Sequence, residues 1–226
     1  MPDMRPLLIF GASRGVGLEL AKLERAAGRP VAAMLRPQSD GSHLQEIGVE
    51  ILRGDALSPS DIEQALSRLS GPFYTVSTLS GRGEDGRLAD DEGNINVIEA
   101  VEADGRARRF MLVTSMGCGD MAPYRSERAI AAFGAVVDAK TLAEDRLKET
   151  ALDWTILRPG GLLSEPATGN GLLSRNPRIH GFIHRADVAL LAFRALRDPA
   201  TSRQAFAAVD ANRMSCETPV DPFPLA

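Results

Sequence analysis

The chain has 226 residues, of which 44% are hydrophobic and 25% are charged, as in ordinary soluble globular proteins. Its formal net charge of -4 gives no electrostatic reason to expect a nucleic acid or an anionic membrane surface as a partner. Cys118 and Cys216 are too few for a disulfide framework, and no apolar run approaches the roughly 20 residues that cross a bilayer, so we expect a reduced, cytoplasmic setting.

Apolar runs of strand length alternate with segments of helical pattern along the whole chain. We expect strands at 7–12, 30–36, 49–55, 73–80, 108–116, 153–160 and 203–210. We expect helices at 15–28, 40–48, 58–69, 90–105, 136–151 and 185–199. Strands joined by crossover helices form a parallel sheet covered on both faces, and nearly continuous apolar strands fit burial on both sides. The pattern therefore predicts a single α/β domain, residues 1–226, with a Rossmann-like doubly wound parallel sheet.

Two long stretches, 117–135 and 161–184, lack a clear helical or strand pattern. Each follows the end of an expected strand, and ligands of doubly wound sheets bind beyond the carboxyl ends of the strands. We expect both stretches to be irregular and to lie on the substrate side of the site.

A glycine-rich loop, "GASRGVG", separates the first expected strand from the first helix. Gly11 permits a tight turn, Gly15 lets the backbone approach a pyrophosphate, and Gly17 lets the helix pack against the strand. Exposed N–H groups at the start of the helix attract the anion. The sequence thus predicts a dinucleotide cradle made by Gly11, Ala12, Ser13, Arg14, Gly15, Val16 and Gly17.

The end of the second expected strand indicates which dinucleotide binds. An acid that holds the ribose 2′-hydroxyl is expected there, but the sequence has Arg36 with no Asp or Glu beside it. A guanidinium suits a 2′-phosphate, and Arg14 offers a second cation. We therefore expect the cofactor to be NADP(H).

Four motifs resemble the short-chain dehydrogenase/reductase superfamily over roughly residues 6–210. They are "IFGASRGVG", "RGDALS", "LVTSMG" and "LKETALDWTILRPGGL", and the late "IHRADVALLAFRAL" also fits. The chain is most similar to the atypical NAD(P)H-binding branch, which includes biliverdin/flavin reductases and NmrA-like proteins. On the adenosine side, the resemblance implies contacts from Asp55, Ala56, Thr78, Leu79 and Ser80.

On the nicotinamide side, the resemblance implies that Thr114 and Ser115 end the fifth strand, with Ser115 facing the substrate. Lys140 matches a helix lysine that reaches the nicotinamide ribose. The backbone expected to contact the carboxamide is that of Pro159, Gly160, Gly161 and Leu162.

The usual catalytic pair of this superfamily is Tyr-x-x-x-Lys, but Val136 stands four residues before Lys140 and has no proton to transfer. Members of the atypical branch that lack this tyrosine include reductases of flavins, quinones and tetrapyrroles, whose acceptors take their proton from solvent. The catalytic candidates are therefore Ser115, Lys140 and Tyr124, one of two tyrosines in the chain.

Two functions fit these residues. The first is an NADPH-dependent oxidoreductase that passes hydride to a small planar acceptor, such as a flavin, a quinone or a related carbonyl compound. The second is a non-catalytic NADP(H)-binding redox sensor of NmrA-like type. In either case we expect a small-molecule ligand and a monomer or weak homodimer. We expect no metal site, because His180 and His184 have no third ligand in evidence.

Overall fold

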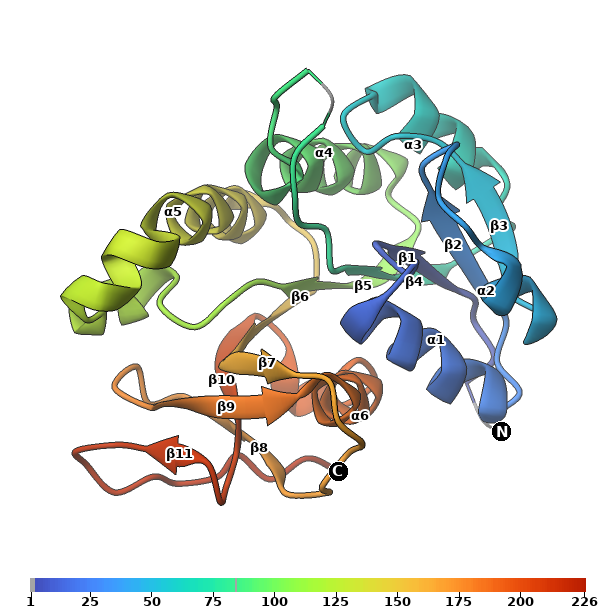
Figure 1. The fold of residues 1–226 in the computed structure, drawn as a ribbon. Coiled ribbons are helices and arrows are strands. Elements are labelled where there is room, and N and C mark those ends of the chain that lie inside the picture. Colours follow the sequence, from blue (N-terminus) through green and yellow to red (C-terminus); the bar gives the residue numbers. More distant parts are fainter. Residues whose placement is uncertain (1–2, 84) are drawn as a thin grey trace.

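The computed structural model describes residues 3–83 and 85–226, and within them eight strands form one sheet in the order β3-β2-β1-β4-β5-β6-β10-β8 (Figure 1). Seven of these described strands run parallel, and β8 pairs antiparallel with β10. The order reverses between β1 and β4, the point where ligands bind in doubly wound sheets. The strands are β1 (Leu7–Phe10), β2 (Val31–Leu35), β3 (Glu50–Arg53), β4 (Phe73–Ser77), β5 (Ala107–Val113), β6 (Trp154–Pro159), β8 (Gly171–Ser174) and β10 (Gln204–Asp210).

Helices cover both faces of the sheet, so its central strands β1, β2, β4 and β6 are buried on two sides. Leu7 and Ile9 of β1 join a core with α1 and α6, whereas Leu8 and Phe10 point to the opposite core with α3, α4 and α5. The helices are α1 (Gly15–Ala26), α2 (Ser42–Glu46), α3 (Pro59–Ser67), α4 (Asn94–Asp104), α5 (Glu127–Glu149) and α6 (Arg185–Ala195), with short turns η1 (Ala89–Gly93, a π-helix), η2 (Gly119–Tyr124) and η3 (Pro199–Thr201). The predicted fold class is confirmed.

A second, small sheet takes two of its three strands from the 161–184 stretch, which was expected to be irregular. Its strands are β7 (Gly161–Leu163), β9 (His180–His184) and β11 (Met214–Ser215), in the order β11-β9-β7. A side chain at Gly160 would place its Cβ 2.3 Å from the Gly181 carbonyl oxygen, so β7 can turn back against β9 only with glycine at this position. The expectation of an irregular 161–184 segment was therefore wrong, because it contains β7, β8 and β9.

The helix expected at 136–151 begins at Glu127, inside the other stretch that was expected to be irregular. Ser126 caps it by accepting a hydrogen bond from the Ala129 N–H at 3.2 Å. The extra turns were missed because Ile130 and Phe133 are 50% and 66% exposed, so no buried apolar stripe marks them. Among the described residues, none of the helices combines the length and apolar character needed to span a membrane.

Candidate functional site

The glycine loop joins β1 to α1 with a backbone that only glycine adopts without strain. Gly11 and Gly15 have φ angles of +91° and +65°. A Cβ at Gly17 would lie 2.5 Å from the Gly11 carbonyl oxygen, so the start of α1 packs directly on the turn. The Thr78 hydroxyl, just beyond β4, donates to the same carbonyl at 2.9 Å and fixes the loop to the neighbouring strand end.

The first turn of α1 is left free for an anion. Arg14 occupies the N-cap position in an extended conformation, and no side chain among the described residues caps the helix. Its first turn also contains no acidic residue. Uncapped N–H groups at a helix start attract phosphate, so this cradle fits the pyrophosphate of a dinucleotide.

Two arginines meet at the end of β2. Arg36 is exposed and follows β2, and Arg53 ends β3 beside Leu35. Arg53 Nη1 donates to the carbonyl oxygens of Arg36 at 3.1 Å and Ser39 at 2.6 Å, which holds the turn in place. Sequence reasoning identified Arg36 but missed Arg53, whose only signal was its place at the next strand end.

Asp55 and Ala56 form a fixed turn just after β3. The Asp55 carboxylate accepts from the Leu57 N–H at 3.0 Å, and the Asp55 N–H donates to the Asp61 carboxylate at 2.8 Å. Ala56 is buried. This turn lies beside Arg53, at the edge of the sheet where the adenosine contacts were expected.

Lys140 lies in a buried ion pair that the sequence did not reveal. Its Nζ is 2.7 Å from Asp90 Oδ1 and donates to the Leu79 carbonyl at 3.3 Å. The Asp90 carboxylate also accepts from the Ser80 hydroxyl and the Gly81 N–H, both at 2.8 Å. Asp90 sits on η1, and π-helical turns of this kind are frequent at functional sites. The pair thus ties α5 to the backbone that follows β4.

Thr114 points into a buried polar network. Its hydroxyl donates to Glu144 Oε1 at 2.7 Å, and Glu144 accepts from Arg158 Nη2 at 2.6 Å. Arg158 also pairs with Asp120 at the surface. The half-buried Ser115 instead donates to the Met116 carbonyl at 3.2 Å. Ser115, unlike Thr114, therefore has a hydroxyl outside this network.

Cys118 lies next to this network and is chemically inert. It is fully buried, and its thiol lies 3.5 Å from the Val137 carbonyl oxygen. Burial, together with the nearby Glu144 carboxylate, raises the pKa of the Cys118 thiol to about 11. The nucleophilic thiolate is therefore scarce at neutral pH.

The other candidate proton donor, Tyr124, lies at the surface. It ends η2, and the Arg178 guanidinium is 4.9 Å from the centre of its ring. Val136 is partly exposed on α5, one turn before Lys140. The aliphatic side chain of Val136 has no proton to transfer.

Arg185 connects the glycine loop to the segment after β6. It is the first residue of α6, and its Nη1 donates to the Leu162 carbonyl at 3.2 Å and the Ser164 hydroxyl at 2.8 Å. Its Cδ and Nε would lie 3.7 Å from a Cβ placed on Gly15. The "IHRADV" motif contained this arginine, but its approach to the loop follows only from the fold.

Backbone hydrogen bonds join the end of β6 to the strands on both sides of it. The Met116 N–H, after β5, donates to the Pro159 carbonyl, and the Gly160 N–H donates to the Ala208 carbonyl of β10, both at 2.9 Å. The first of these bonds brings the residue after Ser115 beside the expected carboxamide contacts at Pro159–Leu162.

His184, Asp187 and Asp210 are buried together, and one side-chain nitrogen or oxygen atom of each lies within 4.8 Å of those of the other two. The Asp187 carboxylate accepts from the N–H groups of Thr168 and Gly169, both at 2.9 Å. Asp210 accepts from the Thr168 hydroxyl at 2.6 Å, and this bond holds the pKa of Asp210 below its usual value. The carboxylates thus anchor the loop between β7 and β8.

Three comparisons place this geometry among known proteins. The family model described as NAD(P)H-binding matches residues 11–199. The structure of ChuY, an anaerobilin reductase from Escherichia coli, is 39% identical, with a TM-score of 0.84 over 92% of this chain and 98% of that one. A Bacillus subtilis protein named uncharacterized sugar epimerase YhfK is 29% identical over 88% of this chain and 92% of its own. A short-chain dehydrogenase/reductase from Veillonella parvula in complex with NADP, 17% identical with a TM-score of 0.69, has the same fold over 92% of this chain and 95% of its own.

Proposed function

Because the chain belongs to the NAD(P)H-binding family, in the atypical branch of the short-chain dehydrogenases/reductases, we propose that it is an NADPH-dependent reductase of a planar, conjugated acceptor, with an open-chain tetrapyrrole as the first choice. The observation that carries this proposal is an uncapped glycine-loop cradle in a chain that has Val136, a residue with no proton to transfer, one turn before Lys140. The 39% sequence identity to an anaerobilin reductase, over nearly the whole of both chains, supports the choice of acceptor.

The proposed cofactor site uses the residues at the carboxyl ends of β1 to β6. The backbone of Gly11–Gly17 binds the pyrophosphate, with the Arg185 guanidinium close to Gly15. Arg36 and Arg53 contact the 2′-phosphate, since both lie at the turn after β2. When bound, NADPH supplies a hydride. Lys140 and Asp90 hold the Leu79–Gly81 backbone in position.

The proposed acceptor site lies over Ser115, between two groups of exposed apolar side chains. Ile130, Phe133 and Val136 are exposed on the first half of α5, which follows the carboxyl end of β5. Leu162 and Phe182 are exposed on β7 and β9, which follow β6. Apolar side chains favour a flat, weakly polar acceptor, and the Ser115 hydroxyl would orient it by a hydrogen bond. The proton then comes from water.

A non-catalytic redox sensor is the second candidate, and Val136 is the observation that favours it. An epimerase, as the name of the Bacillus subtilis relative suggests for that protein, needs a competent acid and base. Val136 supplies neither, and the raised pKa of Cys118, about 11, leaves little thiolate to act as a base at neutral pH.

Acceptor assays distinguish these functions. Purified protein is mixed with NADPH and, separately, with biliverdin, FMN or a benzoquinone, and loss of the reduced nicotinamide absorbance is followed. We expect biliverdin to give the largest kcat/KM. Tight NADPH binding without oxidation by any of the three acceptors would favour the sensor and contradict the reductase.

The same assay tests the cofactor preference. Arg36→Ser should raise the KM for NADPH about tenfold or more and leave that for NADH unchanged, because it removes a charge-assisted bond to the 2′-phosphate. Arg68→Ser, at the exposed C-terminal end of α3, is the matched control and should change neither. Equal losses with NADPH and NADH would contradict the assignment.

A further inference from the structure

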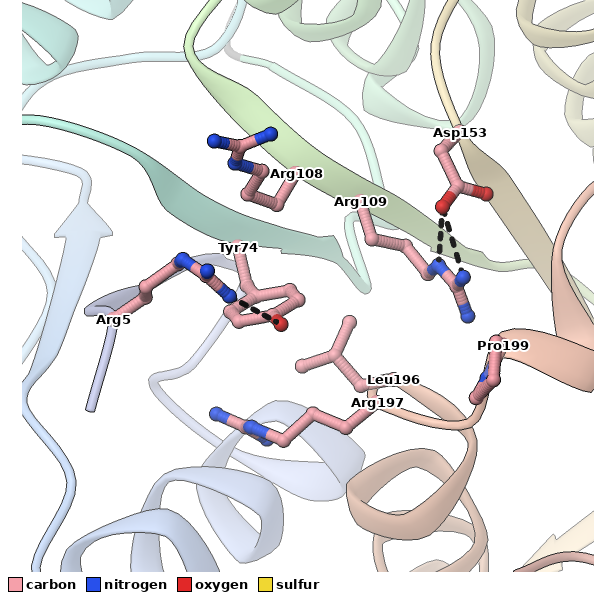
Figure 2. A pocket seen from close by; sticks show the side chains of 8 residues that line it. All are labelled: Arg5, Tyr74, Arg108, Arg109, Asp153, Leu196, Arg197 and Pro199. Atoms are coloured by element: carbon pink, nitrogen blue, oxygen red, sulfur yellow. Dashed lines mark hydrogen bonds and ion pairs between the residues drawn. The ribbon is translucent and has the colours of Figure 1, made fainter. Parts of the chain in front are cut away.

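A hollow of about 350 Å³ lies at the edge of the sheet opposite the glycine loop (Figure 2). Tyr74 is near the start of β4, Arg108 and Arg109 are near the start of β5, and Asp153 precedes β6. The carboxyl ends of these strands carry the proposed cofactor and acceptor sites, so the hollow is separate from both. Its lining includes four arginines, Arg5, Arg108, Arg109 and Arg197, together with Tyr74 and Asp153.

Three of the four lining arginines are paired with carboxylates. Arg5 pairs with Asp3 at 2.7 Å, and Arg109 pairs with Asp153 at 2.8 Å. Of these two carboxylates, Asp153 alone lines the hollow. Because Asp3 and Asp153 compensate Arg5 and Arg109, any surplus positive charge comes from the other two lining arginines, Arg108 and Arg197.

The third pair shares its negative charge with another arginine. Arg197 lies 2.7 Å from Glu24, which also pairs with Arg29 at 3.3 Å. Arg108 is exposed and forms no ion pair within the part of the chain that the structure describes, and Figure 2 draws no contact from it to the other lining side chains. Positive charge therefore remains unbalanced here, and Arg108 carries the exposed, unpaired part of it.

The walls beside Arg108 are rigid. Arg109 is almost fully buried, and its Nη1 donates to the Asp198 carbonyl at 2.7 Å and the Thr201 hydroxyl at 2.8 Å. The Tyr74 ring lies 4.8 Å beneath the Arg197 guanidinium. Burial, and then the hydrogen bond to Asp3, raises the pKa of Tyr74, so its phenol stays neutral and adds no negative charge.

We propose that this hollow is a second anion site, which takes a small molecule bearing two or more oxyanion groups. A guanidinium presents a planar fork of donors that matches phosphate and carboxylate oxygens. The volume of about 350 Å³ lies within the roughly 300–1,000 Å³ usual for small-molecule sites, and it exceeds what a single bound ion needs. Arg108 supplies the unpaired charge that the anion neutralises.

Equilibrium dialysis of labelled pyrophosphate against the protein saturated with NADP⁺ tests this proposal. Saturation keeps pyrophosphate away from the glycine loop. We expect one saturable site, weakened roughly tenfold or more by Arg108→Ser and partly restored by Arg108→Lys. Arg128→Ser is the matched control, because Arg128 is exposed at the start of α5 on the opposite edge, and it should leave binding unchanged.

Competition with citrate then identifies the oxyanion. Displacement of pyrophosphate by citrate at similar concentration indicates a general polyanion site, and resistance to citrate indicates phosphate. Absence of binding with NADP⁺ present, or equal binding to wild type and Arg108→Ser, would overturn the proposal. Circular dichroism of Arg108→Ser checks that the exposed substitution leaves the fold intact.

Discussion

Asp90→Asn is the substitution that we expect to reveal the contribution of the buried ion pair at the proposed cofactor site. The side chains of Lys140 and Asp90 are 9% and 1% exposed, and their charged atoms are 2.7 Å apart. Without the carboxylate charge, the Lys140 ammonium is left with neutral acceptors, the Leu79 carbonyl at 3.3 Å and the amide oxygen of the new asparagine. Removal of one partner from a buried pair costs about 3–5 kcal/mol, because an uncompensated charge is left in the interior. We expect the free energy of unfolding to fall by about this amount at neutral pH.

Urea unfolding followed by circular dichroism measures this loss, and fluorescence titration with NADPH provides the second readout. Asp90 also holds the Ser80 hydroxyl and the Gly81 N–H, so the dissociation constant for NADPH should rise as this backbone loosens. The matched control is Glu99→Gln, which breaks an exposed pair with Arg146 between α4 and α5. Exposed pairs contribute at most about 1 kcal/mol, so the control should change stability little.

A double substitution separates burial of charge from loss of hydrogen bonds. Asp90→Asn combined with Lys140→Met removes both charges and should recover part of the stability that Asp90→Asn alone loses. The reasoning is refuted if Asp90→Asn costs less than about 1 kcal/mol, or if the double variant is no more stable than the single one.

Three further results are expected. Arg185→Met should weaken NADPH binding about tenfold in a fluorescence titration by removing a cation beside Gly15, and an unchanged dissociation constant would place the pyrophosphate elsewhere. Iodoacetamide at pH 8 should label the half-buried Cys216 well before Cys118, because a pKa of about 11 leaves about one Cys118 thiol in a thousand ionised. Mass spectrometry that finds Cys118 labelled first would contradict its burial. Val136→Tyr should add no aldehyde or ketone reduction to the NADPH-oxidation assay, because Lys140 is engaged by Asp90; a rate well above wild type would show that the lysine is available.

The fold was predictable because burial on both faces leaves a simple record in the sequence. All four residues of β1 are buried, two in each core, so the strand reads as one apolar run ending at Gly11. The family resemblance is confirmed by the NAD(P)H-binding family model, which matches residues 11–199. The first turns of α5 left no such record, because Ile130 and Phe133 face outward.

The contacts that position the site were harder to predict, because they join residues that the sequence keeps apart. Asp90 and Lys140 come from η1 and α5, and Gly15 and Arg185 come from the first and last of the described α-helices. For Thr114, the position was predictable but the direction of the side chain was not. Its position at the end of β5 was expected, but Glu144 on α5 draws its hydroxyl into the interior.

The absence of the tyrosine and the engagement of the lysine belong together. In the Tyr-x-x-x-Lys pair, the lysine lowers the pKa of the tyrosine. This effect requires an ammonium group whose charge is not compensated by a nearby carboxylate. Here Asp90 compensates the Lys140 ammonium at 2.7 Å, so its field at position 136 is reduced whichever residue stands there. The proton must then come from water. Hydride transfer to a conjugated acceptor can proceed in this way, because the acceptor delocalises the negative charge. Hydride transfer to a simple ketone is disfavoured, because it would leave a localised alkoxide. The ion pair at Asp90 therefore favours the planar acceptors independently of Val136.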